Sequence, residues 1–265
     1  MNRLSLKILP LTVVLLVFVG CTKSFDGMNT SPNSPTAIGP QYLLTYALEQ
    51  SIDRYWGGRT RFERLNIDAG ELWIQHLARN IYSNEGDNYE ASQALMLNNW
   101  RSFFNDALLN YQRIMTITDE KGTAPNANYY GAALVMRTWV FSLLTDIFGA
   151  IPYSEAIKGT ASEPIYTPKY DTQEAIYAGM LADLKVANEK LSTTGPAING
   201  DILYNGNILR WKKFANSLRV RLANRQAAKK PAESRAILKE ILADPVKFPL
   251  FTSNDDNAAL KCTPV

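Results

Sequence analysis

The stretch ANYYGAALVMRTWVFSLLTDIF, residues 127–148, decides the fold. Its residues are apolar on nearly every side of a helix, apart from a narrow polar stripe of Thr138, Ser142, Thr145 and Asp146. A helix of this kind is buried between neighbouring elements. It is not expected to span a membrane, because Arg137 interrupts an apolar run that is already shorter than the roughly 20 residues required. The stretch therefore predicts the buried helix of a helical domain.

Helical spacing of apolar residues continues on both sides of this stretch. It predicts further helices over residues 41–56, 61–80, 93–118, 171–192, 208–229 and 231–243. Gly70 weakens the second of them by about 1 kcal/mol relative to alanine. Asp171 and Glu174 resemble a capping box, and Pro231 occupies the favoured first position of the last helix. Residues 202–204 and 248–252 are expected to form short strands at most.

These helices are expected to pair. Residues 93–118 and 127–148 form one predicted hairpin, and residues 171–192 and 208–229 form a second. Aromatic and alanine positions inside both hairpins suit close helix packing, as in tetratricopeptide arrays. We therefore predict an all-α fold, with paired helices in a tetratricopeptide-like α-solenoid scaffold with long loops.

The N-terminus has the pattern of a secretion leader. Arg3 and Lys7 precede an apolar run over 8–19, which is too short to span a bilayer as a helix and suits a signal peptide over residues 1–20. Phe18-Val19-Gly20-Cys21 resembles a bacterial lipobox, in which the cysteine is acylated after cleavage, and two or more acyl chains anchor a protein stably. We predict lipid attachment at Cys21. The alternative is an ordinary signal peptide followed by an incidental cysteine.

Residues 21–40 are predicted to be a flexible tether before a helical domain over 41–265, because they are rich in Ser, Thr, Asn, Pro and Gly. Without Arg3 and Lys7, 26 basic residues face 25 acidic ones, so the charge balance gives no indication of a nucleic-acid partner. The mature chain would retain one unlipidated thiol, Cys262, without an intramolecular disulfide.

The sequence does not predict a catalytic residue, a metal site or a cofactor. His76 is the single histidine, and H-E-x-x-H, paired C-x-x-C and G-x-S-x-G motifs are absent. Asp146 and Glu155 are the best candidates for an acid/base pair in glycoside hydrolysis. An Asp at a helix end followed by Gly149 and Pro152 more strongly indicates a carboxylate that bonds backbone N–H groups.

Basic residues gather late in the chain, largely opposite the apolar face of the 208–229 helix. They are Arg210, Lys212, Lys213, Arg219, Arg221, Arg225, Lys229 and Lys230. The cluster has two interpretations, a solvated helix face or a surface for an acidic partner or lipid headgroups.

Several segments, taken in order, resemble the SusD/RagB family of outer-membrane lipoproteins. They are LLTDIFGAIPYSEAIKG at 143–159, YDTQEAIY at 170–177, Gly200-Asp201-Ile202 to Gly206, WKKFANSLRVRLANR at 211–225 and SNDDNA at 253–258. The similarity covers essentially all of the mature chain and is greatest to the SusD-like nutrient-binding subgroup. Family members usually run well beyond this length. The resemblance therefore implies that 41–265 is the N-terminal part of a longer family domain, truncated at its C-terminus.

The resemblance implies a non-enzymatic protein on the cell surface, anchored in the outer membrane by lipid. Such proteins cap a SusC-like TonB-dependent transporter and bind an oligosaccharide, or in some branches a peptide, for import. Two alternatives remain open: a helical-repeat scaffold lipoprotein of an envelope complex, and a lipid-anchored glycosidase.

Sugar binding uses flat aromatic faces with flanking hydrogen-bonding groups, so aromatic residues in polar loops are better candidates than those at helical spacing. The segment NIYSNEGDNYE, residues 80–90, fits this description. It makes Tyr82, Asn84, Asn88 and Tyr89 the candidate ligand-binding residues, with ordinary loop packing as the alternative. Trp100, Trp139 and Trp211 are expected in the core.

Overall fold

The computed structural model describes residues 38–56, 65–81, 86–90, 92–159, 161 and 163–260. The predicted leader, Cys21, nearly all of the tether, Tyr82, Asn84 and Cys262 lie outside these ranges. The expectations for them therefore stay predictions.

Helices make up the regular structure of the described residues. The longer ones are α3 (Pro40–Trp56), α4 (Gln93–Ser102), α5 (Leu109–Thr118), α6 (Ala127–Phe148), α7 (Gln173–Lys190), α8 (Ile208–Arg225) and α9 (Pro231–Ala243). The short ones are η1 (Leu65–Glu71), η2 (Gly86–Asn88), η3 (Phe103–Leu108) and η4 (Asn254–Asp256). These elements confirm the predicted all-α class.

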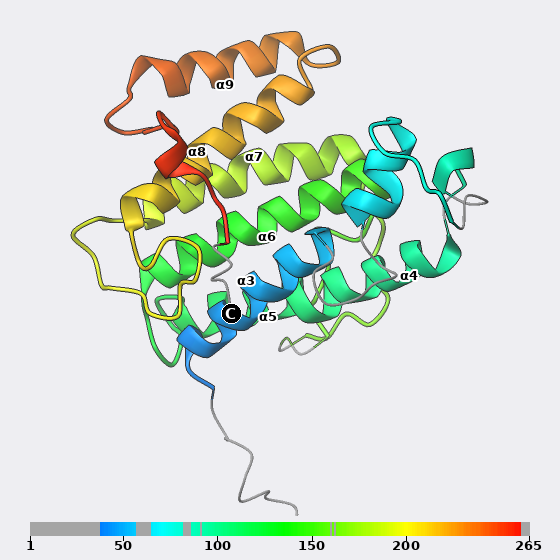
Figure 1. Cartoon of the computed structure of the whole chain (residues 1–265). Coiled ribbons are helices and arrows are strands. Elements are labelled where there is room, and N and C mark those ends of the chain that lie inside the picture. The colour runs from blue at the N-terminus through cyan, green and yellow to red at the C-terminus, as the bar shows by residue number, and fades with distance from the viewer. Residues whose placement is uncertain are drawn as a thin grey trace, which may run out of the picture. The chain divides into compact units, whose positions relative to one another are not determined.

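Helix α6 lies at the centre of the helical domain (Figure 1). It packs against α5 and α7 along its length and also contacts α3 and α8. Within the part of the chain that the structure describes, α6 alone is long and apolar enough to cross a membrane, but 67% of that apolar window is buried inside the protein. The buried central helix predicted from residues 127–148 is thus confirmed.

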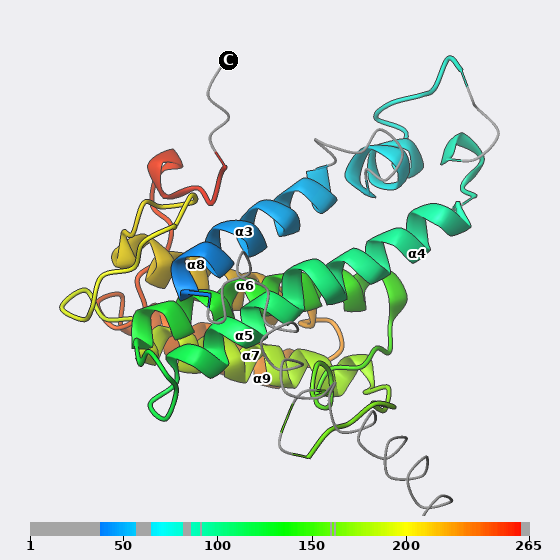
Figure 2. The ribbon, with the colours of Figure 1, turned by 90° about the horizontal axis from the view of Figure 1, so that it is seen from below.

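The other helices stack on either side of α6. Helix α7 packs on α8 and α8 packs on α9, while α5 packs on α3 (Figure 1). The segment from α4 through η3 to α5 forms one continuous helical run beside α3 (Figure 2). Both predicted hairpins are therefore present, as α5–α6 and α7–α8, in the antiparallel order of a helical-repeat scaffold.

The predicted helix over 61–80 is wrong beyond its first part. Residues 61–64 lie outside the described ranges, and helical structure runs only from Leu65 to Trp73. The chain then turns at Gln75, whose φ of 60° is left-handed, and Ile74 and Leu77 are exposed. Apolar spacing alone does not secure a helix, because most helical stability comes from packing of the apolar face, and these apolar side chains are not buried.

Two smaller expectations are also corrected. The N-cap of α7 is Thr172, whose hydroxyl accepts the N–H of Ala175, so the predicted capping box of Asp171 and Glu174 is wrong. Asp171 instead accepts the backbone N–H groups of Tyr153 and Ser154. Residues 202–204 form a turn and residues 248–252 are irregular, so neither segment is a strand.

Candidate functional site

Two of the four predicted ligand-binding residues, Asn88 and Tyr89, lie at the end of η2 in the segment between α3 and α4. Tyr89 follows Asn88 directly and has a left-handed φ of 61°. Its side chain is 60% exposed, and its hydroxyl accepts a hydrogen bond from Nε2 of Gln75 at 2.8 Å. Non-glycine residues rarely adopt this backbone conformation, and such strain gathers at functional sites.

The turn that carries Tyr89 is attached to the η1 segment. Asp87 accepts the backbone N–H of Arg79 at 3.1 Å, and Arg79 forms an ion pair of 2.6 Å with Asp68. Gly86 approaches η1 so closely that a Cβ would lie 2.5 Å from Cδ1 of Leu72. These contacts fix the turn, and the bond from Gln75 places one side-chain amide beside the exposed ring of Tyr89, as a sugar-binding surface would require.

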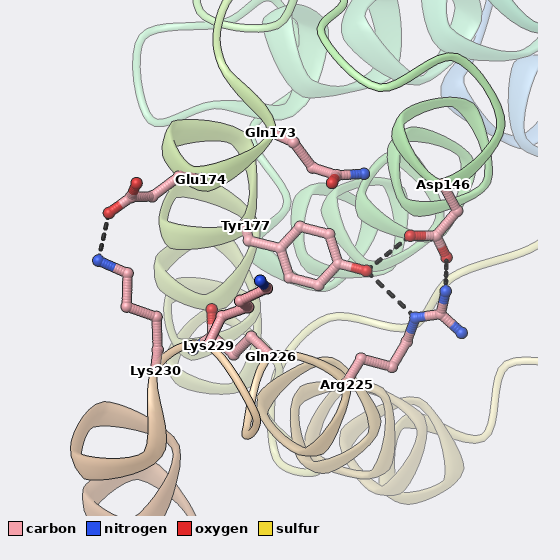
Figure 3. A pocket seen from close by; sticks show the side chains of 8 residues that line it. All are labelled: Asp146, Gln173, Glu174, Tyr177, Arg225, Gln226, Lys229 and Lys230. Atoms are coloured by element: carbon pink, nitrogen blue, oxygen red, sulfur yellow. Dashed lines mark hydrogen bonds and ion pairs between the residues drawn. The ribbon is translucent and has the colours of Figure 1, made fainter.

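A separate polar pocket of about 670 Å³ lies where the ends of three helices meet (Figure 3). It is formed by the end of α6, the start of α7, the end of α8 and the connection from α8 to α9. Its lining residues are Asp146, Gln173, Glu174, Tyr177, Arg225, Gln226, Lys229 and Lys230. The volume lies within the range of small-molecule sites.

One wall of this pocket is a closed hydrogen-bonded group of three side chains. Asp146 accepts the hydroxyl of Tyr177 at 2.6 Å and pairs with Nη2 of Arg225 at 2.9 Å. Nε of Arg225 also donates to the Tyr177 hydroxyl at 3.2 Å. Burial, followed by the hydrogen bond to Asp146, raises the pKa of Tyr177 above its ordinary value. The tyrosine therefore stays protonated and neutral.

The proposed carboxylate pair for hydrolysis belongs to two different networks. Asp146 is engaged by Tyr177 and Arg225, as Figure 3 shows. Glu155 accepts the backbone N–H of Lys169 at 3.0 Å and lies 3.7 Å from its ammonium group. Among the described residues, Asp146 thus binds side chains of two other helices, so the expectation that its carboxylate bonds backbone N–H groups is wrong.

The cluster of basic residues largely stabilises the fold. Lys212 donates to the carbonyl oxygens of Asn188 and Leu191. The other pairs are Lys213 with Asp256, Arg219 with Glu240, Arg225 with Asp146 and Lys230 with Glu174. Most of these basic side chains thus bind groups within the protein, and few of them remain available to an acidic surface partner.

The three tryptophans expected in the core differ in burial. Trp211 is fully buried, as predicted, whereas Trp100 and Trp139 are partly buried and pack against the core. Trp100 stacks on Tyr170, with ring centroids 6.3 Å apart and planes at 14°, and Tyr170 is 63% exposed. Sequence reasoning missed Tyr170, although its position in the polar loop before α7 is the signal applied to Tyr89.

Several residues of the resembling segments are buried hydrogen-bond centres. Asp201 accepts the backbone N–H groups of Leu203, Tyr204 and Gly206 and also Nε1 of Trp211. Among the residues with described positions, no group of three His, Cys, Asp or Glu side chains could hold a metal ion. These conspicuous polar residues therefore organise loops.

A family model described as "Starch-binding associating with outer membrane" matches residues 32–265. The chain belongs to this SusD-like family. Searching curated protein sequences returns no significant match.

Solved structures of the same fold include a chitin-binding protein that is 32% identical in sequence, with a TM-score of 0.70. The match covers 83% of this chain and 45% of the chitin-binding protein. A SusD-like protein of Bacteroidetes is 28% identical with a TM-score of 0.71, over 86% and 40% of the two chains. A SusD homolog from Parabacteroides distasonis, 20% identical with a TM-score of 0.71 over 83% and 41%, shows the likeness of the fold alone. This SusD-like chain therefore spans less than half the length of these proteins.

Proposed function

We propose that this SusD-like chain is a cell-surface lipoprotein that binds a nutrient glycan and delivers it to a SusC-like TonB-dependent transporter in the outer membrane. The family match over residues 32–265, with its description as starch-binding and outer-membrane-associated, carries the proposal. The similarity to a chitin-binding protein also favours a glycan over a peptide. In this proposal, residues 1–20 are the leader, 21–40 are the tether from a lipidated Cys21, and 41–265 are the binding domain.

The glycan is proposed to contact Tyr82, Asn84, Asn88 and Tyr89. The exposed ring of Tyr89, held by Gln75, supplies a flat apolar face. Neighbouring amide and carboxylate groups supply hydrogen bonds to sugar hydroxyls. A helical-repeat scaffold protein of the envelope remains the second candidate, since the family membership and helices suit it, but it gives no role to an exposed, strained tyrosine.

Isothermal titration of the full chain in detergent, with malto-oligosaccharides and chito-oligosaccharides, tests glycan binding. Tyr89→Ala should weaken the binding of the preferred glycan by about tenfold, or roughly 1.4 kcal/mol, because the stacking face is lost. Tyr42→Ala is the matched control, since Tyr42 is an exposed tyrosine on α3. Equal affinity of wild type and Tyr89→Ala would remove Tyr89 from the site, and the absence of binding to either glycan class would contradict starch-like or chitin-like recognition.

A further inference from the structure

The polar pocket between the ends of α6, α7 and α8 has more hydrogen-bond donors than its own acceptors use. Its two carboxylates are both occupied, Asp146 by Tyr177 and Arg225, and Glu174 by Lys230 (Figure 3). Among the described residues, the ammonium group of Lys229 has neither a hydrogen bond nor an ion pair. With three cations and two carboxylates, the lining carries a formal excess of one positive charge.

Gln226 supplies a second, independent observation. Its Nε2 atom is buried and has no hydrogen-bond partner in the part of the chain that the structure describes. A buried polar group without a partner costs free energy, so such groups normally bind water or a ligand. Gln226 lines the same pocket as Lys229.

The helix ends that surround the pocket also favour a negatively charged ligand. At the end of α6, the carbonyl of Thr145 accepts the N–H of Gly149 and Nε2 of Gln173. Beyond the end of α8, the carbonyl of Gln226 accepts the N–H groups of Lys229 and Lys230. One carbonyl at each of these two helix ends is thus already hydrogen-bonded. Gln173 and Glu174 begin α7 and line the pocket, and the first N–H groups of a helix lack intrahelical partners and favour anions.

The pocket also offers groups for a polyhydroxyl ligand. Nε2 of Gln173 is fixed by the Thr145 carbonyl, so the Oε1 atom of the same amide is left to accept a hydroxyl. The ring of Tyr177 lies between the two ion pairs, in the middle of the pocket (Figure 3). This combination suits a ligand that carries both hydroxyls and one negative charge.

We propose that this pocket binds an acidic sugar, whose carboxylate lies against Lys229 and Gln226 and whose hydroxyls contact Gln173. The inference rests on the proposed function, in that it assigns a charged class of sugar to a glycan-binding protein. It adds a site distinct from the Tyr89 turn. Asp146 and Arg225 support the wall, and Lys229 provides the charge that selects the ligand.

Titration of the full chain with glucuronate, glucose and inorganic phosphate tests the site. Glucuronate should bind more tightly than glucose, and its affinity should fall as salt rises from about 0.01 M to about 1 M, because screening weakens the exposed ion pair. Lys229→Gln should weaken glucuronate binding by about fivefold, and Lys229→Arg should restore it, since the pair is partly exposed. Lys239→Gln, at an exposed lysine farther along α9, removes the same charge and should leave affinity unchanged.

The outcomes separate this inference from the proposed function. Equal glucuronate affinity of wild type and Lys229→Gln, or equal affinity for glucose and glucuronate, would overturn the acidic-sugar site. Phosphate that binds as tightly as glucuronate and is lost in Lys229→Gln would also overturn it, in favour of a simple anion site. In each of these cases, the binding of neutral glycans through Tyr89 would be unaffected. If neutral glycans did not bind but glucuronate did, only the proposed starch-like function would be contradicted.

Discussion

Single polar residues stabilise the loops of this molecule, and Asp256 is the clearest case. Its carboxylate accepts the ammonium group of Lys213 at 2.8 Å, the N–H and hydroxyl of Thr252 and the N–H of Ser253. The bond from Lys213, followed by the backbone N–H of Thr252, holds the pKa of Asp256 well below its ordinary value. An unfolded aspartate titrates near pH 3.9, so the unfolded chain binds this proton first as pH falls.

Asp256 should therefore make folding stability depend on pH in one direction. Its contribution is fully present above about pH 4 and is lost as pH falls from there toward the lowered pKa of the folded state. Asp256→Asn should be less stable than wild type at neutral pH, and the difference should shrink in acid. Urea unfolding across pH measures this, with the exposed Asp255→Asn as the control. A difference between wild type and Asp256→Asn that stays constant with falling pH would contradict the prediction.

At the same scale, the sequence indicates which residues are conspicuous but not what they do. The SNDDNA segment could be picked out by its pattern, yet Lys213 lies 43 residues before Asp256. For Asp146, the following glycine and proline predicted bonds to backbone N–H groups, whereas its carboxylate binds two side chains. Its partners Tyr177 and Arg225, on two other helices, were not predictable, because only packing brings them together.

At the scale of elements, patterns succeed where burial and local chemistry agree. The bounds of α6 and α9 match those predicted, since the first is apolar on nearly all sides and the second begins at Pro231. The helix over 61–80 fails because spacing alone does not say whether a neighbour covers the apolar face. The capping box fails because Asp171 and Thr172 can both cap a helix, and Asp171 is taken by Ser154.

Close packing of α6 on α7 makes a prediction for Gly131. A Cβ at this position would lie 2.7 Å from Cγ of Leu191, at the end of α7. Gly131→Ala should therefore destabilise the protein by about 1–3 kcal/mol through overpacking, in spite of the roughly 1 kcal/mol that alanine gains over glycine in a helix. Urea denaturation measures the change in the free energy of unfolding.

Gly70 is the matched control for Gly131. It also lies in a helical turn, but the nearest atom to a Cβ at this position would be Oδ1 of Asn66 at 3.4 Å. Gly70→Ala should thus be neutral or stabilising. A Gly131→Ala variant at least as stable as wild type would show that Leu191 moves aside at no cost, and would argue against a rigid α6–α7 contact.

For the whole molecule, the two hairpins were predictable because the helices of each hairpin follow one another directly in the sequence. The acidic-sugar pocket was not, since its walls come from α6, α7, α8 and the turn before α9, and no local pattern relates them. Tyr89 could be proposed from the sequence because aromatic residues in polar loops are a local signal. The polar pocket could thus not be predicted from the sequence, because it depends on tertiary packing.

The proposed cell-surface function depends on the N-terminal anchor, and Cys21 tests it. Cys21→Ala should abolish the incorporation of labelled palmitate and release the protein from the membrane fraction, because stable anchoring requires two or more acyl chains. Cys262→Ala is the matched control and should keep the label, since only a cysteine directly after the leader is acylated. Protease added to intact cells should then cleave the wild-type protein. Full protection in cells that still incorporate palmitate would favour the periplasm-facing scaffold, because a chain anchored on the inner side is beyond the reach of the protease.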